Sequence, residues 1–195
     1  GIYTIKVYSF SEQVDSLFKT AMQEFASSKS NKLIIDLRGN PGGYLGSAVA
    51  MSSYFVPSGK VVVSQDYGEK KKIEQLRSLG YDLLKNKNAK IVVLVDGGSA
   101  SASEIVAGAL QDYKVATIMG EKTFGKGSVQ EYIKITAKTG LKVTIARWLT
   151  PSGNSISVSG LMPDIEVKKA TSTTMEQITK RTDNQYLKAV EFLNK

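Results

Sequence analysis

Residues 98–104 are the first candidate for a nucleophile, because they place serines among small residues between an apolar run and a helical pattern. The apolar run at 91–95 predicts a buried strand, and a helix is expected from about 103 to 111. Such a junction exposes a reactive side chain while the flanking elements hold it rigid. The unpaired amides that open the helix could stabilise an oxyanion. In isolation, a simple helix cap at Ser101 or Ser103 explains this segment better.

Residues 120–130 contain Lys126 between two glycines. Residues 120–126 fit the G-x-x-x-x-G-K pattern of a phosphate-binding loop, but Gly127 stands where that loop needs Ser or Thr, and a strand is expected to follow instead of a helix. Alternatively, Lys126 could be a general base, since burial would favour the neutral amine that accepts a proton from a serine hydroxyl. Taken alone, a surface loop with a solvated lysine is the commoner case.

Residues 38–43, Arg-Gly-Asn-Pro-Gly-Gly, form a glycine-rich turn after the apolar run at 33–37. A turn of this kind exposes backbone N–H groups at the end of a buried strand. One of those groups could complete an oxyanion hole. Without other motifs, a plain tight turn is the safer interpretation.

The chain contains no histidine and no cysteine, and these two absences exclude whole classes of site. A Ser-His-Asp triad, a thiol nucleophile, disulfides, and histidine or thiolate metal sites cannot be built from it. Acyl chemistry would therefore need a lysine, a carboxylate or water as its base. We expect no metal and no cofactor.

The size and charge of the chain are those of an ordinary globular core. Its 195 residues suit one domain, with or without a small appendage, and 42% are hydrophobic. No stretch approaches the roughly 18 apolar residues of a membrane span. The net charge of +8 could indicate nucleic acid or an anionic surface as partner. The scattered lysines favour a solvated basic surface instead.

Strands and helices alternate up to about residue 120, which predicts an α/β core with crossover connections, followed by a more β-rich part. Strands are expected at 2–8, 33–37, 60–64, 91–95 and 115–119; helices after an N-cap at Ser11 up to Phe25 and at 45–55, 73–84 and 103–111; a hairpin at 129–135 and 141–148; and a helical tail from Thr174.

The three motifs together resemble the C-terminal processing, or tail-specific, peptidases. In that family the turn reads L-R-x-N-P-G-G, the nucleophile segment S-A-S-A-S-E-I and the lysine segment G-E-x-T-F-G-K-G-x-x-Q. This chain carries them in the same order at residues 37–43, 99–105 and 120–130, with further matches at 150–153, 163–165 and 183–189. The resemblance covers nearly the whole chain.

The resemblance assigns roles to individual residues. It implies that Ser101 is the nucleophile, that Lys126 is the general base and that Gln130 positions the lysine. The oxyanion donors would be the amide of Ala102 and one glycine of the Pro-Gly-Gly turn, with Gly43 preferred over Gly42. The implied reaction is acyl transfer through an acyl-enzyme.

The resemblance also implies a fold and a division of the chain. We expect an α/β fold with a Clp-protease/crotonase-like core of repeated ββα-type units, a β-rich C-terminal part and a terminal helix. The catalytic core would span residues 1–170 and a helical tail 171–195. The PDZ domain and the signal or anchor segment usual in the family are not expected within the chain, which therefore reads as a piece of a longer protein. Asp96 and Leu161-Met162 depart from the family's usual spelling.

The partners follow from the same resemblance. They are polypeptide substrates, cleaved near their C-termini, with no nucleic acid, no transmembrane segment in this chain and possible self-association. Family members are exported to the bacterial envelope or beyond it. Two alternatives stay open: a catalytically silent crotonase-like scaffold, and a basic nucleic-acid-binding module suggested only by the net charge.

Overall fold

A parallel sheet of five strands forms the centre of the molecule. The computed structural model describes residues 1–85, 87–157 and 159–195. The strand order is β1-β2-β5-β6-β9, and each neighbouring pair is parallel, so the connections must cross over the sheet. The strands are β1 (Tyr3–Lys6), β2 (Lys32–Asp36), β5 (Lys90–Val95), β6 (Thr117–Gly120) and β9 (Ile165–Glu166).

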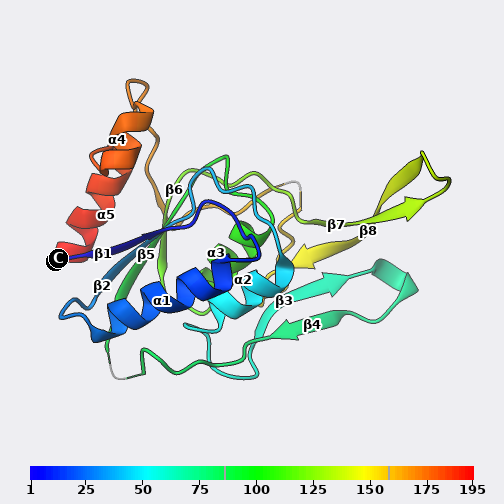
Figure 1. The fold of residues 1–195 in the computed structure, drawn as a ribbon, viewed down its shortest axis with the longest axis horizontal. Helices are drawn as coiled ribbons and strands as arrows, with labels where there is room; N and C mark the ends of the chain where they lie inside the picture. Colours follow the sequence, from blue (N-terminus) through cyan, green and yellow to red (C-terminus); the bar gives the residue numbers. More distant parts are fainter. Residues whose placement is uncertain (86, 158) are drawn as a thin grey trace.

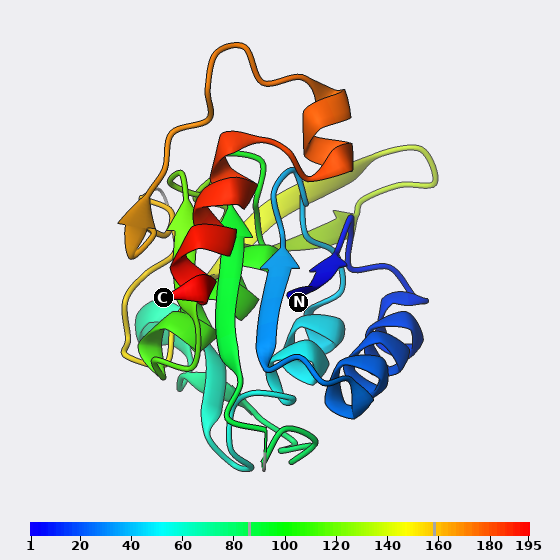
Figure 2. The same ribbon diagram turned by 90° about the vertical axis from the view of Figure 1, so that its left-hand side faces the viewer.

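Helices cover both faces of this sheet. Leu33 and Ile35 of β2 belong to the core cluster on one face, whereas Ile34 lies in a second cluster with Ala189 and Leu193 of the C-terminal helix. Because successive strand residues point to opposite faces, a continuous apolar run suits a strand that is covered twice. Figure 2 shows the C-terminal helix lying across the second face. The helices are α1 (Val14–Ser27), α2 (Leu45–Ser52) and α3 (Ala102–Asp112) on the first face and α5 (Asn184–Asn194) on the second.

A four-stranded antiparallel sheet adjoins this core. Its strand order is β4-β3-β8-β7, and β3 pairs with β8 over residues 64–66 and 147–149. The predicted hairpin of β7 and β8 is present. Figure 1 shows the β3–β4 and β7–β8 hairpins extending from the same side of the molecule. The strands are β3 (Val61–Asp66), β4 (Glu74–Arg77), β7 (Ser128–Lys134) and β8 (Gly140–Leu149), with the short 3-10 helix η1 (Gly68–Lys70) between β3 and β4.

The helix predicted at 73–84 is wrong. Residues 74–77 form β4 and pair with β3, and the Ser78 N–H and C=O bond the backbone of Lys60 and Gly59. Gly80 continues with a positive φ of 66° against Ser58, where no Cβ would fit. The apolar spacing of this segment suited a helix, but pairing with a distant strand overrides that local preference.

The ends of two other helices also differ from expectation. The side chain of Ser11 does not cap α1, which begins at Val14; the Ser11 carbonyl accepts the Val14 N–H. The tail contains α4 (Met175–Lys180) before α5, separated by the left-handed residue Arg181. No helix in the described ranges is both long enough and apolar enough to cross a bilayer.

Candidate active site

The structure brings the three motifs together through backbone hydrogen bonds. The N–H of Ala100 donates to the carbonyl of Asn40 at 3.0 Å, and the N–H of Phe124 donates to the carbonyl of Ser99 at 3.0 Å. The Ser103 hydroxyl also donates to the Asn40 carbonyl, at 3.0 Å. The nucleophile segment therefore lies between the glycine-rich turn and the lysine loop.

Ser101 has an unusual backbone conformation, with φ 54° and ψ −113°. It stands at the N-cap of α3 and is partly exposed. Positive φ is uncommon for a residue with a side chain, and such strain typically costs about 1–3 kcal/mol. Gly42 lies directly against it, since a Cβ on Gly42 would be 2.8 Å from Ser101 Cβ and 3.0 Å from Ala102 N. The turn can approach the serine this closely only because residue 42 is glycine.

Glu104 joins the nucleophile to the lysine loop. Its carboxylate is fully buried and accepts hydrogen bonds from Thr123 Oγ1 at 2.6 Å and Gly125 N at 2.7 Å on Oε1. Its Oε2 accepts from Ser101 N at 2.8 Å and Lys126 N at 3.0 Å. The nitrogens of Ser101 and Lys126 are therefore no farther apart than the sum of those two distances.

Glu104 has no role in the site that the sequence motifs predict. A signal was present, because a Ser followed by Glu three residues later at the start of a helix is the pattern of a capping box. That pattern predicts the bond from Glu104 to the Ser101 N–H. It does not predict the bonds to residues 123–126, which depend on the tertiary fold.

Lys126 and Gln130 are exposed, which agrees with a lysine in a surface loop and differs from the buried lysine considered as a general base. Gly127 is buried and packs against the backbone of Ile156 and Ser157, so the loop is anchored while its lysine side chain is not. Within the described residues, no hydrogen bond links Lys126 Nζ to Ser101 Oγ or to Gln130. The backbones of Ser101 and Lys126 thus lie close together, but their side chains are not hydrogen-bonded to each other.

In the turn at 39–43 the amides of Gly39, Asn40 and Gly42 donate hydrogen bonds, whereas that of Gly43 is available. Gly42 N donates to Asn40 Oδ1 at 2.9 Å, and the buried Asn40 is itself fixed through Nδ2 to the Val7 carbonyl at 2.8 Å. Among the described residues, no protein acceptor takes the amides of Gly43 and Ala102. These two amides, and not that of Gly42, are the available candidates for oxyanion donors.

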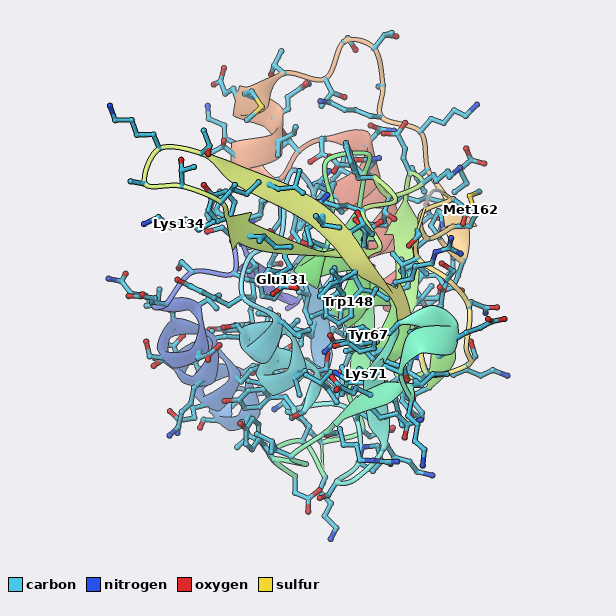
Figure 3. All side chains as sticks on the ribbon, turned by 90° about the vertical axis from the view of Figure 1, so that its right-hand side faces the viewer. Tyr67, Lys71, Glu131, Lys134, Trp148 and Met162 are labelled. Atoms are coloured by element: carbon cyan, nitrogen blue, oxygen red, sulfur yellow. The ribbon has the colours of Figure 1, made fainter. Side chains whose placement is uncertain are left out.

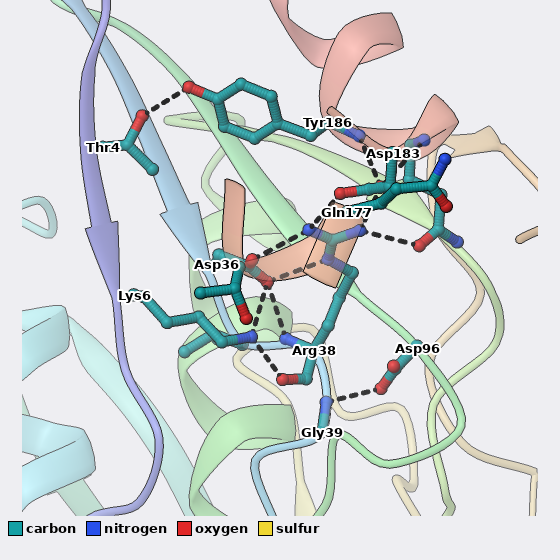
Figure 4. A network of polar contacts seen from close by, with 12 residues as sticks. Thr4, Lys6, Asp36, Arg38, Gly39, Asp96, Gln177, Asp183 and Tyr186 are labelled. Carbon is teal, nitrogen blue, oxygen red and sulfur yellow. Dashed lines mark hydrogen bonds and ion pairs between the residues drawn. The ribbon is translucent and has the colours of Figure 1, made fainter. Parts of the chain in front are cut away.

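A buried ion network that no sequence motif predicts adjoins this turn. Arg38 donates to Asp36 and to Asp183 at the start of α5, and Lys6 forms an ion pair with Asp36 at 3.1 Å (Figure 4). Burial by itself would raise the pKa of Asp36, but the hydrogen bond and charge of Arg38, helped by Lys6, hold that pKa below its ordinary value. The same carboxylates raise the pKa of Arg38 despite its burial.

A cleft of about 920 Å³ separates the two hairpins (Figure 3). Its lining comes from both arms, and includes Tyr67 and Lys71 on one side and Glu131 on the other. Lys71 Nζ lies 4.2 Å from the centre of the Tyr67 ring. No lining residue belongs to the three motifs, although Glu131 directly follows Gln130. In the part of the chain that the structure describes, no cluster of acidic residues could hold a metal ion.

Comparison with protein families identifies the chain. The profile described as Peptidase family S41 matches residues 1–167. The chain belongs to Peptidase family S41. The predicted membership of the C-terminal processing peptidases and the predicted fold class, an α/β core of Clp-protease/crotonase type, are thereby confirmed.

Several S41 relatives extend well beyond this chain. A carboxy-terminal-processing protease of Bartonella bacilliformis is 40% identical over 169 residues, covering 85% of this chain and 38% of that protein. A probable CtpA-like serine protease of Staphylococcus epidermidis is 38% identical over 167 residues, covering 86% of this chain and 33% of that protein. The solved photosystem II D1 C-terminal processing protease superposes with a TM-score of 0.77 at 31% identity, covering 85% of this chain and 42% of that one. This chain thus spans about a third of the length of the curated relatives.

Proposed function

We propose that this chain is the catalytic core of a serine endopeptidase in which Ser101 is the nucleophile and Lys126 the general base. The observation that carries the proposal is that the backbone N–H groups of Ser101 and Lys126 donate to the same oxygen, Oε2 of the buried Glu104. The strained backbone of Ser101 and its contact with Gly42 support the same assignment. Strain of this kind persists at functional sites when the surroundings enforce it.

In the proposed reaction, neutral Lys126 accepts the hydroxyl proton while Ser101 Oγ forms a bond to a peptide carbonyl carbon. The amides of Gly43 and Ala102 hold the resulting oxyanion. Lys126 then returns the proton to the leaving amine as the C–N bond breaks. Water attacks the acyl-enzyme, Lys126 takes one of its protons, and Ser101 is released with its hydroxyl restored. Gln130 orients the lysine in this scheme, and rotation of the exposed Lys126 side chain must precede the first step.

The proposed substrates are polypeptides cleaved near their C-termini. The support is that two of the similar proteins are C-terminal processing proteases. We also propose export to the bacterial envelope and self-association, which the sequence motifs' resemblance to the C-terminal processing peptidases implies. We further propose that residues 1–170 are the catalytic core and residues 171–195 a C-terminal helical tail.

A second candidate function is a crotonase-like scaffold that binds but does not cleave. The observation that favours it is the exposed Lys126 side chain, which makes no hydrogen bond to Ser101 Oγ within the described residues. Fold alone does not separate the two functions, because both occur on this type of core.

A fluorophosphonate probe distinguishes the candidates, since it forms a covalent bond only with an activated serine. The peptidase proposal expects one adduct per chain, located at Ser101 by mass spectrometry, and none on Ser101→Ala. It also expects Ser101→Ala to lose peptide hydrolysis by about a thousandfold or more. Absence of labelling and hydrolysis in the wild-type chain, folded as judged by circular dichroism, would favour the silent scaffold.

A further inference from the structure

The C-terminal helix α5 is tied to the residue that precedes the oxyanion turn. Arg38 Nη1 donates to Asp183 Oδ1 at 2.6 Å and to Gln185 Oε1 at 3.0 Å, and Nη2 donates to Asp183 Oδ2 at 3.3 Å. Nε and Nη2 donate to the two oxygens of Asp36 at 3.0 and 2.9 Å. A guanidinium has five N–H donors, so these contacts use all of them and fix the head group in one orientation.

Asp183 accepts hydrogen bonds from three residues at once. Besides Arg38, its Oδ1 accepts the N–H groups of Gln185 at 3.1 Å and Tyr186 at 3.0 Å, which makes it the N-cap of α5. The side chains of Arg38 and Asp183 are only 4% and 1% exposed. Because both charges are buried, water cannot replace either partner, and a shift of the helix end must be transmitted to Arg38.

The backbone after Arg38 leads directly into the catalytic turn. The Arg38 carbonyl accepts Lys6 Nζ at 2.6 Å, and the next amide, Gly39 N, donates to Asp96 Oδ1 at 2.8 Å (Figure 4). Asp96 Oδ1 also accepts Gly98 N at 2.9 Å, in the loop that carries Ser101. Arg38 therefore lies at the point where the turn and the nucleophile loop share a carboxylate.

We propose that Asp183 is a positioning residue for the reaction, and that α5 acts through it and Arg38 to hold the turn that presents the Gly43 amide. This inference rests on the proposed function for its catalytic part. Asp183 and Gln185 lie beyond residues 1–167, the part that matches the family profile. A segment beyond the profile match, whose residues 183–189 also follow the family's sequence, would thus set the geometry of the oxyanion site.

The test uses Asp183→Asn, with Asp183→Ala as a harsher variant. Asparagine keeps an oxygen for the N-cap of α5 but turns an N–H group toward Arg38 Nη2. The matched control is Tyr186→Phe, which removes a 2.9 Å hydrogen bond between α5 and Thr4 and leaves the Arg38 contacts in place. Each protein is assayed well below its own melting temperature, so that the folded fraction is equal.

Hydrogen exchange of the turn is measured first, because it does not require activity. The amides of Asn40, Gly42 and Tyr44 are hydrogen-bonded in the turn, and we expect Asp183→Asn to speed their exchange about tenfold or more relative to Tyr186→Phe. Unchanged exchange at these amides, or an equal increase in the control, would overturn the proposal.

Kinetics then test the catalytic part. We expect Asp183→Asn to lower kcat about tenfold with KM unchanged, since the oxyanion exists only in the transition state. An increase in KM at constant kcat, or equal kinetics in Asp183→Asn and Tyr186→Phe, would contradict a positioning role. A wild-type chain that cleaves no peptide would refute the proposed function, while the exchange measurement would still decide whether α5 controls the turn.

Discussion

The two halves of the candidate site differ in how firmly the fold holds them. On the nucleophile side, Asn40, Ser99 and Glu104 are fully buried and hydrogen-bonded, and they fix the backbone around Ser101. On the base side, Lys126 and Gln130 project from a short loop and the start of a hairpin, and both are exposed. The fold thus holds the proposed oxyanion site rigidly, whereas the proposed base is an exposed lysine side chain.

This difference predicts that removing the lysine separates activity from stability. Lys126→Ala should lower peptide hydrolysis by about a thousandfold or more, because no other group replaces the base. It should change the free energy of unfolding by less than about 0.5 kcal/mol, because the side chain is exposed. Steady-state kinetics and urea unfolding measure the two effects. Lys122→Ala, an exposed lysine of the same loop, is the control, and normal turnover by Lys126→Ala would refute the assignment of the base.

Glu104 belongs to the buried half, so its substitution should affect both quantities. Each oxygen of the Glu104 carboxylate accepts two hydrogen bonds. In Glu104→Gln the amide N–H₂ group replaces one of these oxygens, and it therefore faces two donors in either orientation of the amide. We expect a loss of about 2–3 kcal/mol in unfolding free energy and of about a hundredfold in kcat, since a small displacement at the site is enough for this.

The matched control is Glu121→Gln, which removes a carboxylate in the neighbouring loop that makes no hydrogen bond within the described residues. Urea unfolding and kinetics on both variants provide the comparison. Full activity in Glu104→Gln would mean that the shared oxygen does not position Ser101 and Lys126.

Acid should lower the stability of the fold by protonating Asp36 in the buried half of the site. Its pKa is lowered in the folded chain, so it stabilises the fold above its unfolded pKa of about 3.9, and this contribution is lost as the pH falls through the folded pKa. At pH 7, Asp36→Asn should cost about 3 kcal/mol, because Arg38 loses a buried partner. The difference in unfolding free energy between wild type and Asp36→Asn, measured with urea, should become smaller below pH 4. A difference in unfolding free energy that does not change with pH would contradict a stabilising role of the ionised Asp36.

The smallest effect is expected at Gln130. Because its side chain is exposed, Gln130→Ala should leave the unfolding midpoint unchanged. It should lower kcat roughly tenfold, which corresponds to about 1.4 kcal/mol for one positioning hydrogen bond. Steady-state kinetics alone would measure this. Wild-type kcat in Gln130→Ala would remove Gln130 from the site and leave Lys126 to be oriented by substrate.

The sequence predicted those parts of the molecule that local patterns determine. The apolar runs of β2 and β5 could be recognised as buried strands without knowledge of their partners. The resemblance of the three motifs to the C-terminal processing peptidases was enough to expect them at one site. The bonds from Glu104 to residues 123–126, the exposure of Lys126 and the strand at 74–77 depend on segments distant in sequence. The contact between Arg38 and Asp183 spans 145 residues, and no local spacing could predict it.

The pH dependence of fluorophosphonate labelling tests most directly whether Lys126 activates Ser101. If the neutral amine accepts the serine proton, the labelling rate of wild type should rise toward alkaline pH, and Lys126→Ala should label about a hundredfold more slowly, without that rise. Equal labelling rates in wild type and Lys126→Ala across the pH range would contradict the pairing of Ser101 with Lys126.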